Sequence, residues 1–313
     1  MDIISELSRD LGLLEMDVAR VIRTAPVRYK IYTIPKRSGG IRVIAQPARE
    51  VKFLQRWVTK NVLEKLPIHE AATAYRKGAN IRDNAAAHAQ HSYILKADFK
   101  DFFPSIRPRD LSAHISAYSP AFVSPSNINT LSLLLFRGSA GIDNLILSIG
   151  APSSPALSNT VLYPFDSQCA ALCAERGITY TRYADDLTFS TSEKSVLEPF
   201  LVDLKELIAT VPYPRLTLNE KKTVFASKKG LRRVTGLVLN SEGDVSLGRD
   251  RKRNISAGVH KFIRQQLDTA QTNRLRGLLA FALDVEPAFV ASLEAKYGKQ
   301  VIDALLRRSV TDQ

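Results

Sequence analysis

Two adjacent carboxylates, Asp185 and Asp186, lie in the stretch RYADDLTFS at residues 182–190. An apolar flank precedes them and a strand-like run follows, so the pair falls where the chain is expected to be half buried. Neighbouring side chains on one strand point to opposite faces, and an unpaired carboxylate is costly to bury. A tight turn between two strands would bring both acids near one cation. The pair therefore requires a fold that contains such a hairpin.

A third acid, Asp98, ends an apolar strand in YILKADFKDFF. Alone, an aspartate at a strand end is usually a cap or one half of a salt bridge. If this strand pairs with the hairpin, Asp98 comes next to Asp185, and clustered carboxylates repel one another unless a divalent ion neutralises them. Mg²⁺ suits such a site because it takes oxygen ligands and leaves room for substrate phosphates. Two Mg²⁺ ions about 3.5–4 Å apart would hold the attacking and leaving oxygens of a phosphoryl transfer.

The charge balance indicates a polyanionic partner. Lys and Arg total 44 against 31 Asp and Glu, which gives a net charge of +13. Such an excess is typical of proteins that bind nucleic acid; the alternatives are a protein that is simply basic and one that binds an anionic membrane surface. No run of about 18 apolar residues and no signal-peptide pattern is present, so we expect no membrane contact.

The cysteines indicate a reducing compartment. Cys169 and Cys173 are the only two, and their spacing places them one turn apart on a helix. A disulfide framework or zinc site needs more ligands than this. We expect two reduced, packed thiols and a cytoplasmic location.

Periodicity along the chain predicts a mixed α/β body followed by basic helices. Amphipathic helices open the chain and end at Pro26. Strand alternation on both sides of SGG predicts a β-hairpin, with Lys36 and Arg37 entering its turn and Arg42 leaving it. IRDNAAAHAQH predicts a short helix, and a long helix begins near Pro155. Two further hairpins precede a helical, basic segment beyond residue 248.

Five motifs, taken in order, resemble those of reverse transcriptases from about residue 28 onward. KADFKDFF resembles their first metal-binding motif, IGAPSSPALSN the template and nucleotide loop, and YADD the tyrosine–x–aspartate–aspartate motif. LTLNEKKT resembles the lysine motif and VTGLVL the primer-grip hairpin. The order and relative spacing of the five make the resemblance specific.

Within that class the chain resembles bacterial retron reverse transcriptases. NAAAH at residues 84–88 matches their Asn-Ala-x-x-His signature, and VTG at residues 234–236 matches their second signature. The basic C-terminal run RLRGLLAFALDVEPAFVASLEAKYG resembles their thumb domains.

The resemblance implies an α+β fold with a right-hand polymerase architecture. Fingers and palm would consist of antiparallel sheet packed on helices, and a helical thumb would follow. The expected divisions are N-terminal helices at 1–26, fingers at 27–91, palm at 92–110, a fingers insertion at 111–146, palm with the primer-grip hairpin at 147–247, and a basic helical thumb at 248–313.

The resemblance also implies roles for the acids. Asp98, Asp185 and Asp186 are the expected catalytic residues and ligands of two Mg²⁺ ions, and the backbone carbonyl of Phe99 would complete the coordination. For Asp186 the alternative is a solvated acidic turn.

The expected nucleotide site has a charged part and a steric part. Lys36 and Arg42 would hold the triphosphate, although an exposed cationic hairpin is the alternative. Phe103 would exclude a ribose 2′-hydroxyl by clash, unless it is an ordinary core residue beside Phe102.

Three further positions complete the expected nucleotide site. Gly150 and Ala151 would contribute backbone, and Ile149 stands where many relatives have glutamine. Lys222 would approach the pyrophosphate leaving group, although neighbouring Lys221 leaves the assignment open between the two lysines.

Expected RNA contacts lie in the Asn-Ala-x-x-His segment and in the basic tail. For Asn84 and His88 the alternatives are a capping asparagine and a packed histidine. The tail cations would give salt-dependent affinity without sequence recognition; they are Arg249, Arg251, Lys252, Arg253, Lys261, Arg264, Arg274 and Arg276.

The activity implied by the resemblance is Mg²⁺-dependent synthesis of DNA from deoxynucleoside triphosphates on an RNA template. Synthesis would start at a guanosine 2′-hydroxyl of a structured non-coding RNA that also contains the template, giving branched multicopy single-stranded DNA (msDNA). A companion effector protein and a role in anti-phage defence would accompany it. The alternatives are another bacterial type, intron-derived or diversity-generating, and a polymerase-like protein that binds RNA without catalysis.

Overall fold

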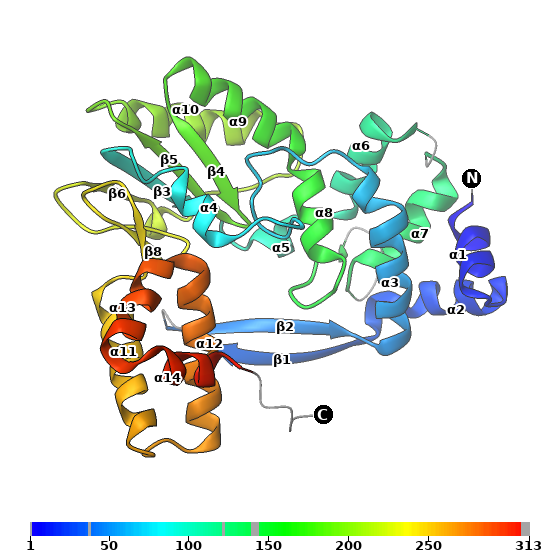
Figure 1. Ribbon diagram of the computed structural model, residues 1–313. Helices are drawn as coiled ribbons and strands as arrows, with labels where there is room; N and C mark the ends of the chain where they lie inside the picture. The colour runs from blue at the N-terminus through cyan, green and yellow to red at the C-terminus, as the bar shows by residue number, and fades with distance from the viewer. Residues whose placement is uncertain (1, 37–38, 121–122, 139–143, 308–313) are drawn as a thin grey trace. The chain divides into compact units, whose positions relative to one another are not determined.

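The computed structural model describes residues 2–36, 39–120, 123–138 and 144–307 (Figure 1). Its contacts divide the chain into two compact units. The first unit contains Met1–Gly78, Leu95–Phe189 and Ser195–Val224, and the second contains Ala79–Ile94, Ser190–Lys194 and Phe225–Gln313. The division expected from the sequence, with a thumb from residue 248, stays a prediction.

Most helices belong to the first unit. Its elements are α1 (Ile3–Leu11), α2 (Glu15–Thr24), η1 (Ala25–Val27), β1 (Tyr29–Pro35), β2 (Ile41–Pro47), α3 (Arg49–Asn61), η2 (Leu63–Lys65), α5 (Phe102–Ser105), α6 (Pro108–Tyr118), α7 (Pro125–Leu135), α8 (Ser154–Val161), α9 (Tyr163–Glu175), β4 (Thr179–Tyr183), α10 (Leu197–Thr210) and η5 (Glu220–Lys222).

Three strands begin in one unit and end in the other: β3 (Tyr93–Asp98), β5 (Asp186–Thr191) and β6 (Val224–Ser227). The second unit contains α4 (Ile81–Ala86), β7 (Arg232–Val234), β8 (Leu237–Leu239), β9 (Val245–Ser246), α11 (Arg249–Ile263), α12 (Thr269–Val285), α13 (Pro287–Tyr297) and α14 (Lys299–Leu306).

A four-stranded sheet in the order β4-β5-β3-β6 carries the predicted acids. Helices α9 and α10 lie against this sheet (Figure 1). The ring of Phe189 on β5 is stacked 5.0 Å from Tyr180 on β4 and lies 4.8 Å from Phe200 on α10. Cys169 and Cys173 on α9 are free and buried. Because large apolar side chains fill the space between helices and strands, the sheet is a rigid support for the residues at its edge.

The predicted fingers hairpin is the antiparallel pair β1 and β2, in register from Tyr29 opposite Pro47 to Pro35 opposite Ile41. The backbone N–H of Lys36 donates to the carbonyl of Gly40 at 3.0 Å and closes the turn. Arg37 lies outside the described residues.

The second signature, VTG, forms the tight turn between β7 and β8. Val234 pairs with Leu237 across two residues, Thr235 with φ 46° and Gly236 with φ 81°. A two-residue hairpin turn of this kind needs positive φ at both positions, which a β-branched residue rarely adopts. The Thr235 hydroxyl donates to the carbonyl of Ile81 at 3.1 Å, so a side-chain bond to α4 holds the unusual conformation.

The second unit has a continuous apolar core. It joins α4, the three-stranded sheet β7-β8-β9 and the helices α11–α14. The predicted α+β class, with antiparallel sheets packed on helices, is confirmed. None of the helices in the described ranges is long and apolar enough to cross a bilayer.

Candidate active site

The paired acids occupy different positions in the β4–β5 hairpin. Ala184 and Asp185 form the connection, and Asp186 is the first residue of β5. Ala184 has φ 58°, in the left-handed region that glycine prefers. This turn resolves the conflict between two neighbouring charges on one strand, because Asp185 lies off the strand.

Strand β3 lies beside β5 and brings Asp98 to the hairpin. The backbone N–H of Phe99 donates to the carbonyl of Asp185 at 3.1 Å. The carbonyl of Asp98 accepts from the backbone N–H of Asn219 at 2.7 Å, and its side chain is buried. Backbone hydrogen bonds on both sides therefore fix the position of Asp98.

Lys222 provides the positive charge at this cluster. Its Nζ donates to Oδ2 of Asp98 at 2.7 Å. Partial burial works against the charged amine, but the hydrogen bond to Asp98 and the charges of Asp98, Asp185 and Asp186 together raise the pKa of Lys222. The lysine motif thus reaches the acids through Lys222.

The carboxylates share one electrostatic environment. Burial, and then the charge of Asp98, raise the pKa of Asp185. Burial, and then the charge of Asp185, raise the pKa of Asp186 to about 6, although Lys96 and Lys222 partly offset this. Clustered, partly desolvated carboxylates show this behaviour when negative charge exceeds positive charge nearby.

The donor chemistry of this cluster fits a hard divalent cation. Three carboxylates supply oxygen ligands, and a divalent ion would relieve the repulsion that raises two of their pKa values. Among the described residues, however, no group of three or more His, Cys, Asp or Glu side chains is arranged to hold a metal ion. Asp98 is engaged by Lys222 instead. The metal assignment of Asp98, Phe99, Asp185 and Asp186 stays a prediction.

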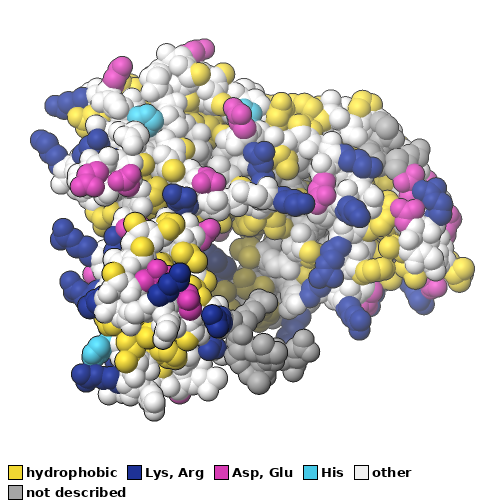
Figure 2. Space-filling model, in the orientation of Figure 1, with side chains coloured by type: hydrophobic (Ala, Val, Ile, Leu, Met, Phe, Trp, Pro, Cys, Tyr) yellow, Lys and Arg dark blue, Asp and Glu magenta, His cyan; other side chains and the backbone are white. Residues whose placement is uncertain are grey.

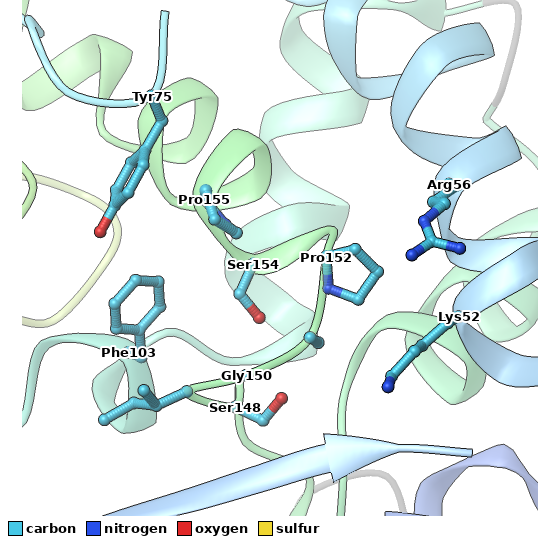
Figure 3. A pocket seen from close by; sticks show the side chains of 11 residues that line it. Lys52, Arg56, Tyr75, Phe103, Ser148, Gly150, Pro152, Ser154 and Pro155 are labelled. Carbon is cyan, nitrogen blue, oxygen red and sulfur yellow. The ribbon is translucent and has the colours of Figure 1, made fainter. Parts of the chain in front are cut away.

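A pocket of about 370 Å³ lies in the first unit (Figure 3). Tyr75 and Phe103 line one side, Lys52 and Arg56 of α3 line the other, and the loop from Ser148 to Pro155 runs between them (Figure 3). Phe103 packs edge-on against Phe102 at 5.2 Å between ring centres. Phe103 therefore lines the pocket and is supported from behind by a second aromatic ring.

Gly150 holds the loop against β2. Its φ is +119°, and a Cβ there would come within 2.9 Å of the Ala45 carbonyl oxygen and 3.1 Å of the Ile44 side chain. The Ala45 N–H donates to the carbonyl of Ile149 at 2.8 Å. Position 149 thus contributes its backbone to the junction, and the adjoining Ala151 is buried.

The fingers cations differ in their surroundings. Arg42 on β2 is close enough for its charge to lower the pKa of Asp185 against the larger effects of burial and Asp98. Lys36 is exposed at the hairpin end. The structure thus gives Arg42, but not Lys36, an electrostatic link to the acids.

Comparison with known proteins identifies the family. The family model "Reverse transcriptase (RNA-dependent DNA polymerase)" matches residues 34–255. The retron Ec83 reverse transcriptase of Escherichia coli is 42% identical over 297 residues, which cover 94% of this chain and 95% of that protein. The chain belongs to the retron reverse transcriptases.

Other retron reverse transcriptases match over similar lengths. The retron Ec86 enzyme of E. coli is 32% identical over 315 residues, covering 97% of this chain and 93% of its own. The retron Mx162 enzyme of Myxococcus xanthus is 32% identical over 324 residues, covering 90% and 67%. As a retron reverse transcriptase, the chain is an RNA-directed DNA polymerase, and its family generally uses divalent metal ions.

Solved structures show a weaker likeness. Telomerase from Candida albicans, in complex with a TWJ fragment of telomeric RNA, is 14% identical with a TM-score of 0.49. The match covers 89% of this chain and 56% of the telomerase chain.

The Asn-Ala-x-x-His signature of this retron reverse transcriptase is buried. Asn84 is 2% exposed and His88 is 0% exposed. Nδ1 of His88 and Nδ1 of His91 both lie 2.7 Å from the Ser190 hydroxyl. A hydroxyl donates one proton, so one of the two histidines donates from Nδ1 and the other accepts. This burial fits the alternative of a packed histidine, and RNA contact by Asn84 or His88 stays a prediction.

The burial of His88 predicts acid sensitivity. Burial, and to a smaller extent the charge of His91, lower the pKa of His88 to about 3. An unfolded histidine protonates near pH 6.5, so the folded state loses stability as pH falls below about 6.5, by up to about 1.4 kcal/mol per pH unit. Urea unfolding between pH 4 and 8 measures this slope.

His88→Asn is the matched variant for this slope, because an amide can hydrogen-bond Ser190 without titrating. We expect a shallower loss of unfolding free energy with acid in His88→Asn than in the parent. Equal slopes in the two proteins would contradict the assignment of this acid sensitivity to His88. Asp185 and Asp186 contribute equally to both proteins, so the difference reports on His88 together with His91, which shares Ser190 and whose pKa burial also lowers.

The eight tail cations separate into two groups. Arg249, Arg253, Lys261, Arg264 and Arg274 are exposed. The other three are partly buried and have local partners: Lys252 pairs with Glu286 at 2.5 Å, Arg251 lies 5.3 Å from the Phe281 ring centre, and Arg276 donates to Asn273 at 3.0 Å. Figure 2 shows Lys and Arg side chains distributed over the face in view rather than confined to one spot. The exposed five are the better candidates for phosphate contact.

Outside the segment from Ser148 to Pro155, three pocket residues were missed from the sequence: Tyr75, Lys52 and Arg56. Lys52 and Arg56 are four residues apart on a helix, and that spacing signals a shared face. Tyr75 carries no such signal, because its φ of 60° and its position follow from loop contacts.

Proposed function

We propose that this enzyme makes branched msDNA from a structured non-coding RNA that supplies both the template and a priming 2′-hydroxyl. The observation that carries the proposal is 42% identity to a retron reverse transcriptase across 94% of the chain. Both signature segments pack together in the second unit, where Ala85 and Val234 belong to one apolar core. Intron-derived and diversity-generating enzymes are the competing candidates.

Two Mg²⁺ ions are proposed as the cofactor, held by Asp98, Asp185, Asp186 and the carbonyl of Phe99. Bound Mg²⁺ would lower the charge on the phosphates and orient the attacking hydroxyl. The chain's own part is to keep the acids clustered and desolvated, so that their oxygens are available to a cation. Lys222, which donates to Asp98, would hold a proton for the leaving pyrophosphate.

The proposed nucleotide site combines charge, backbone and shape. Lys36 and Arg42 would bind the triphosphate, with the guanidinium able to make paired contacts. Gly150 and Ala151 would present the loop backbone to the nucleotide. Phe103, which lines the pocket, would press on the sugar.

Phe103→Ala is expected to weaken the choice of deoxynucleotides. Removing the ring leaves space for a 2′-hydroxyl, so the ratio of kcat/KM for dNTP over rNTP should fall by about tenfold or more. Single-nucleotide primer extension on an RNA template gives this ratio. Phe102→Leu is the control, because Phe102 is buried beneath Phe103 and does not line the pocket. Unchanged sugar selectivity in Phe103→Ala would remove it from the nucleotide site.

Binding of the cognate RNA is assigned to the exposed tail cations, through backbone phosphates. Recognition of one particular RNA must then use its loops or unpaired ends, because A-form duplexes are bound mainly by shape. A companion effector protein, a role in anti-phage defence and a cytoplasmic location complete the proposal by analogy with the family.

The nucleic acid that copurifies with the full chain from its native host tests the proposal. Sequencing and debranching should show a short DNA joined to RNA through a 2′–5′ bond. Only linear cDNA, or cDNA primed from a 3′-hydroxyl, would favour an intron-derived or diversity-generating enzyme. RNA without any cDNA would favour a binding protein without catalysis.

A further inference from the structure

A fully buried ion pair lies behind the acidic hairpin. Arg182 on β4 and Asp166 on α9 are both 0% exposed. The guanidinium contacts the carboxylate twice, from Nη2 at 2.6 Å and from Nε at 2.8 Å, and Tyr180 donates its hydroxyl to the same carboxylate at 2.8 Å. Buried pairs of this kind contribute little net stability compared with packed apolar residues. Their presence calls for another role.

The remaining nitrogen of Arg182 reaches the hairpin connection. Nη1 donates to the carbonyl of Ala184 at 3.1 Å and to Oδ1 of Asn159 at 3.2 Å. Ala184 is the residue with φ 58°, immediately before Asp185. A non-glycine residue keeps such a conformation only where its surroundings enforce it. The bond from Arg182 is the side-chain contact that does so.

The same cluster holds the loop that carries Tyr75. Nδ2 of Asn159 donates to the carbonyl of Ala74 at 2.7 Å. The backbone carbonyl of Arg182 accepts from the N–H of Thr73 at 2.8 Å. Tyr75 has φ 60°, and its ring centre lies 6.5 Å from that of Tyr183. Ala184 and Tyr75 both have positive φ. The buried cluster bonds the carbonyl of Ala184 itself and the carbonyl of Ala74, which precedes Tyr75.

We propose that Arg182, oriented by Asp166, is a positioning residue for the Asp185 connection, and that Asn159 extends the same support to the Tyr75 wall of the nucleotide pocket. The inference builds on the proposed roles of Asp185 and of that pocket. The geometry requires arginine, because a lysine amine cannot hold both carboxylate oxygens and the Ala184 carbonyl in one plane.

Arg182→Lys tests the first part. It keeps the charge beside Asp166 but loses the planar fork, so the Ala184 carbonyl loses its donor. We expect kcat in primer extension to fall by about tenfold or more, with KM for dNTP little changed. The affinity for Mn²⁺, measured from the EPR signal of the free ion, should fall by a similar factor. Arg182→Lys/Ala184→Gly should recover part of both losses, because glycine adopts positive φ without support.

Asn159→Ala tests the second part. It releases the Ala74 carbonyl and removes one acceptor of Arg182 Nη1, while the bonds from Arg182 to Asp166 and to the Ala184 carbonyl remain. We expect KM for dNTP to rise more than kcat falls, the opposite split from Arg182→Lys. Arg176→Lys is the matched control for Arg182→Lys, because Arg176 belongs to a different ion pair of the same unit, with Asp203.

Thermal unfolding separates positioning from stability. If Arg182→Lys lowers only the unfolding temperature, with kcat and Mn²⁺ affinity equal to those of Arg176→Lys, the proposal is overturned. If Arg182→Lys does not fold, the double variant Asp166→Leu/Arg182→Met replaces the ion pair by apolar side chains of similar volume. We expect this double variant to show the same loss of kcat. A kcat equal to that of the parent would overturn the proposal.

The metal proposal fails separately. If the parent binds Mn²⁺ no better than Asp185→Asn, the metal assignment of Asp185 is wrong. The positioning role of Arg182 is then decided by kcat. A loss of kcat in Arg182→Lys that Ala184→Gly partly recovers supports this role, and an unchanged kcat in Arg182→Lys overturns it.

Discussion

We expect Asp185→Asn to reduce RNA-templated DNA synthesis by about 10³-fold or more, on the scale seen when an enzyme loses a central catalytic group. The substitution keeps the size and shape of the side chain and removes its charge. Asp185 is the acid of the hairpin connection, beside Asp98 on the neighbouring strand. Single-turnover primer extension with dNTPs on an RNA template measures the loss.

The same variant should not be less stable than the parent. Burial and the charge of Asp98 raise the pKa of Asp185, so the folded state disfavours its ionised form. At pH 7 the carboxylate is charged in the unfolded chain, and keeping that charge in the folded chain lowers the free energy of unfolding. An uncharged amide removes this destabilisation. Urea unfolding should give an unchanged or higher midpoint.

Asp284→Asn is the charge-matched control, because Asp284 is exposed on α12. If the Asp185→Asn enzyme polymerises at the same rate as the Asp284→Asn enzyme, the clustered acids are not catalytic. That result would then favour the alternative of a polymerase-like protein that only binds RNA.

Gly150→Ala is expected to lower kcat/KM by about 10²-fold, the effect of displacing a site by roughly 1 Å. A methyl group at position 150 would meet the Ala45 carbonyl at 2.9 Å, and backbone cannot move aside as a flexible side chain can. The junction between the loop and β2 must open, which displaces the pocket wall that Ala151 and Pro152 provide. Steady-state extension kinetics test this, and the free energy of unfolding should fall by about 1–3 kcal/mol.

Gly177→Ala separates backbone strain from displacement. Gly177 also has positive φ, +62°, but a Cβ there would meet nothing within 4 Å. This control should lose about 1 kcal/mol of stability and keep its activity. If Gly150→Ala has the kcat/KM of Gly177→Ala, the loop is not part of the nucleotide site.

The motifs and the fold class were accessible from the sequence because they depend on local pattern. Strand alternation around SGG and the acids at strand ends gave the hairpins and the meeting of Asp98 with Asp185. The contact between Lys222 and Asp98 was not accessible, because two neighbouring lysines have the same local pattern and only the path of η5 selects one.

Burial was the main property that local pattern did not reveal. For Asn84 and His88 the sequence left RNA contact and a capping or packed role equally open, and in the structure both side chains are buried. Arg182 was overlooked for a related reason. An arginine next to a catalytic motif looks like a surface cation until Asp166, from another element, is placed opposite it.

Strand β5 connects the histidine segment with the acidic hairpin. Its first residue is Asp186, and Ser190, four positions later, is the residue that His88 and His91 both bond. The two histidines therefore anchor the same strand that begins with the second acid of the YADD motif.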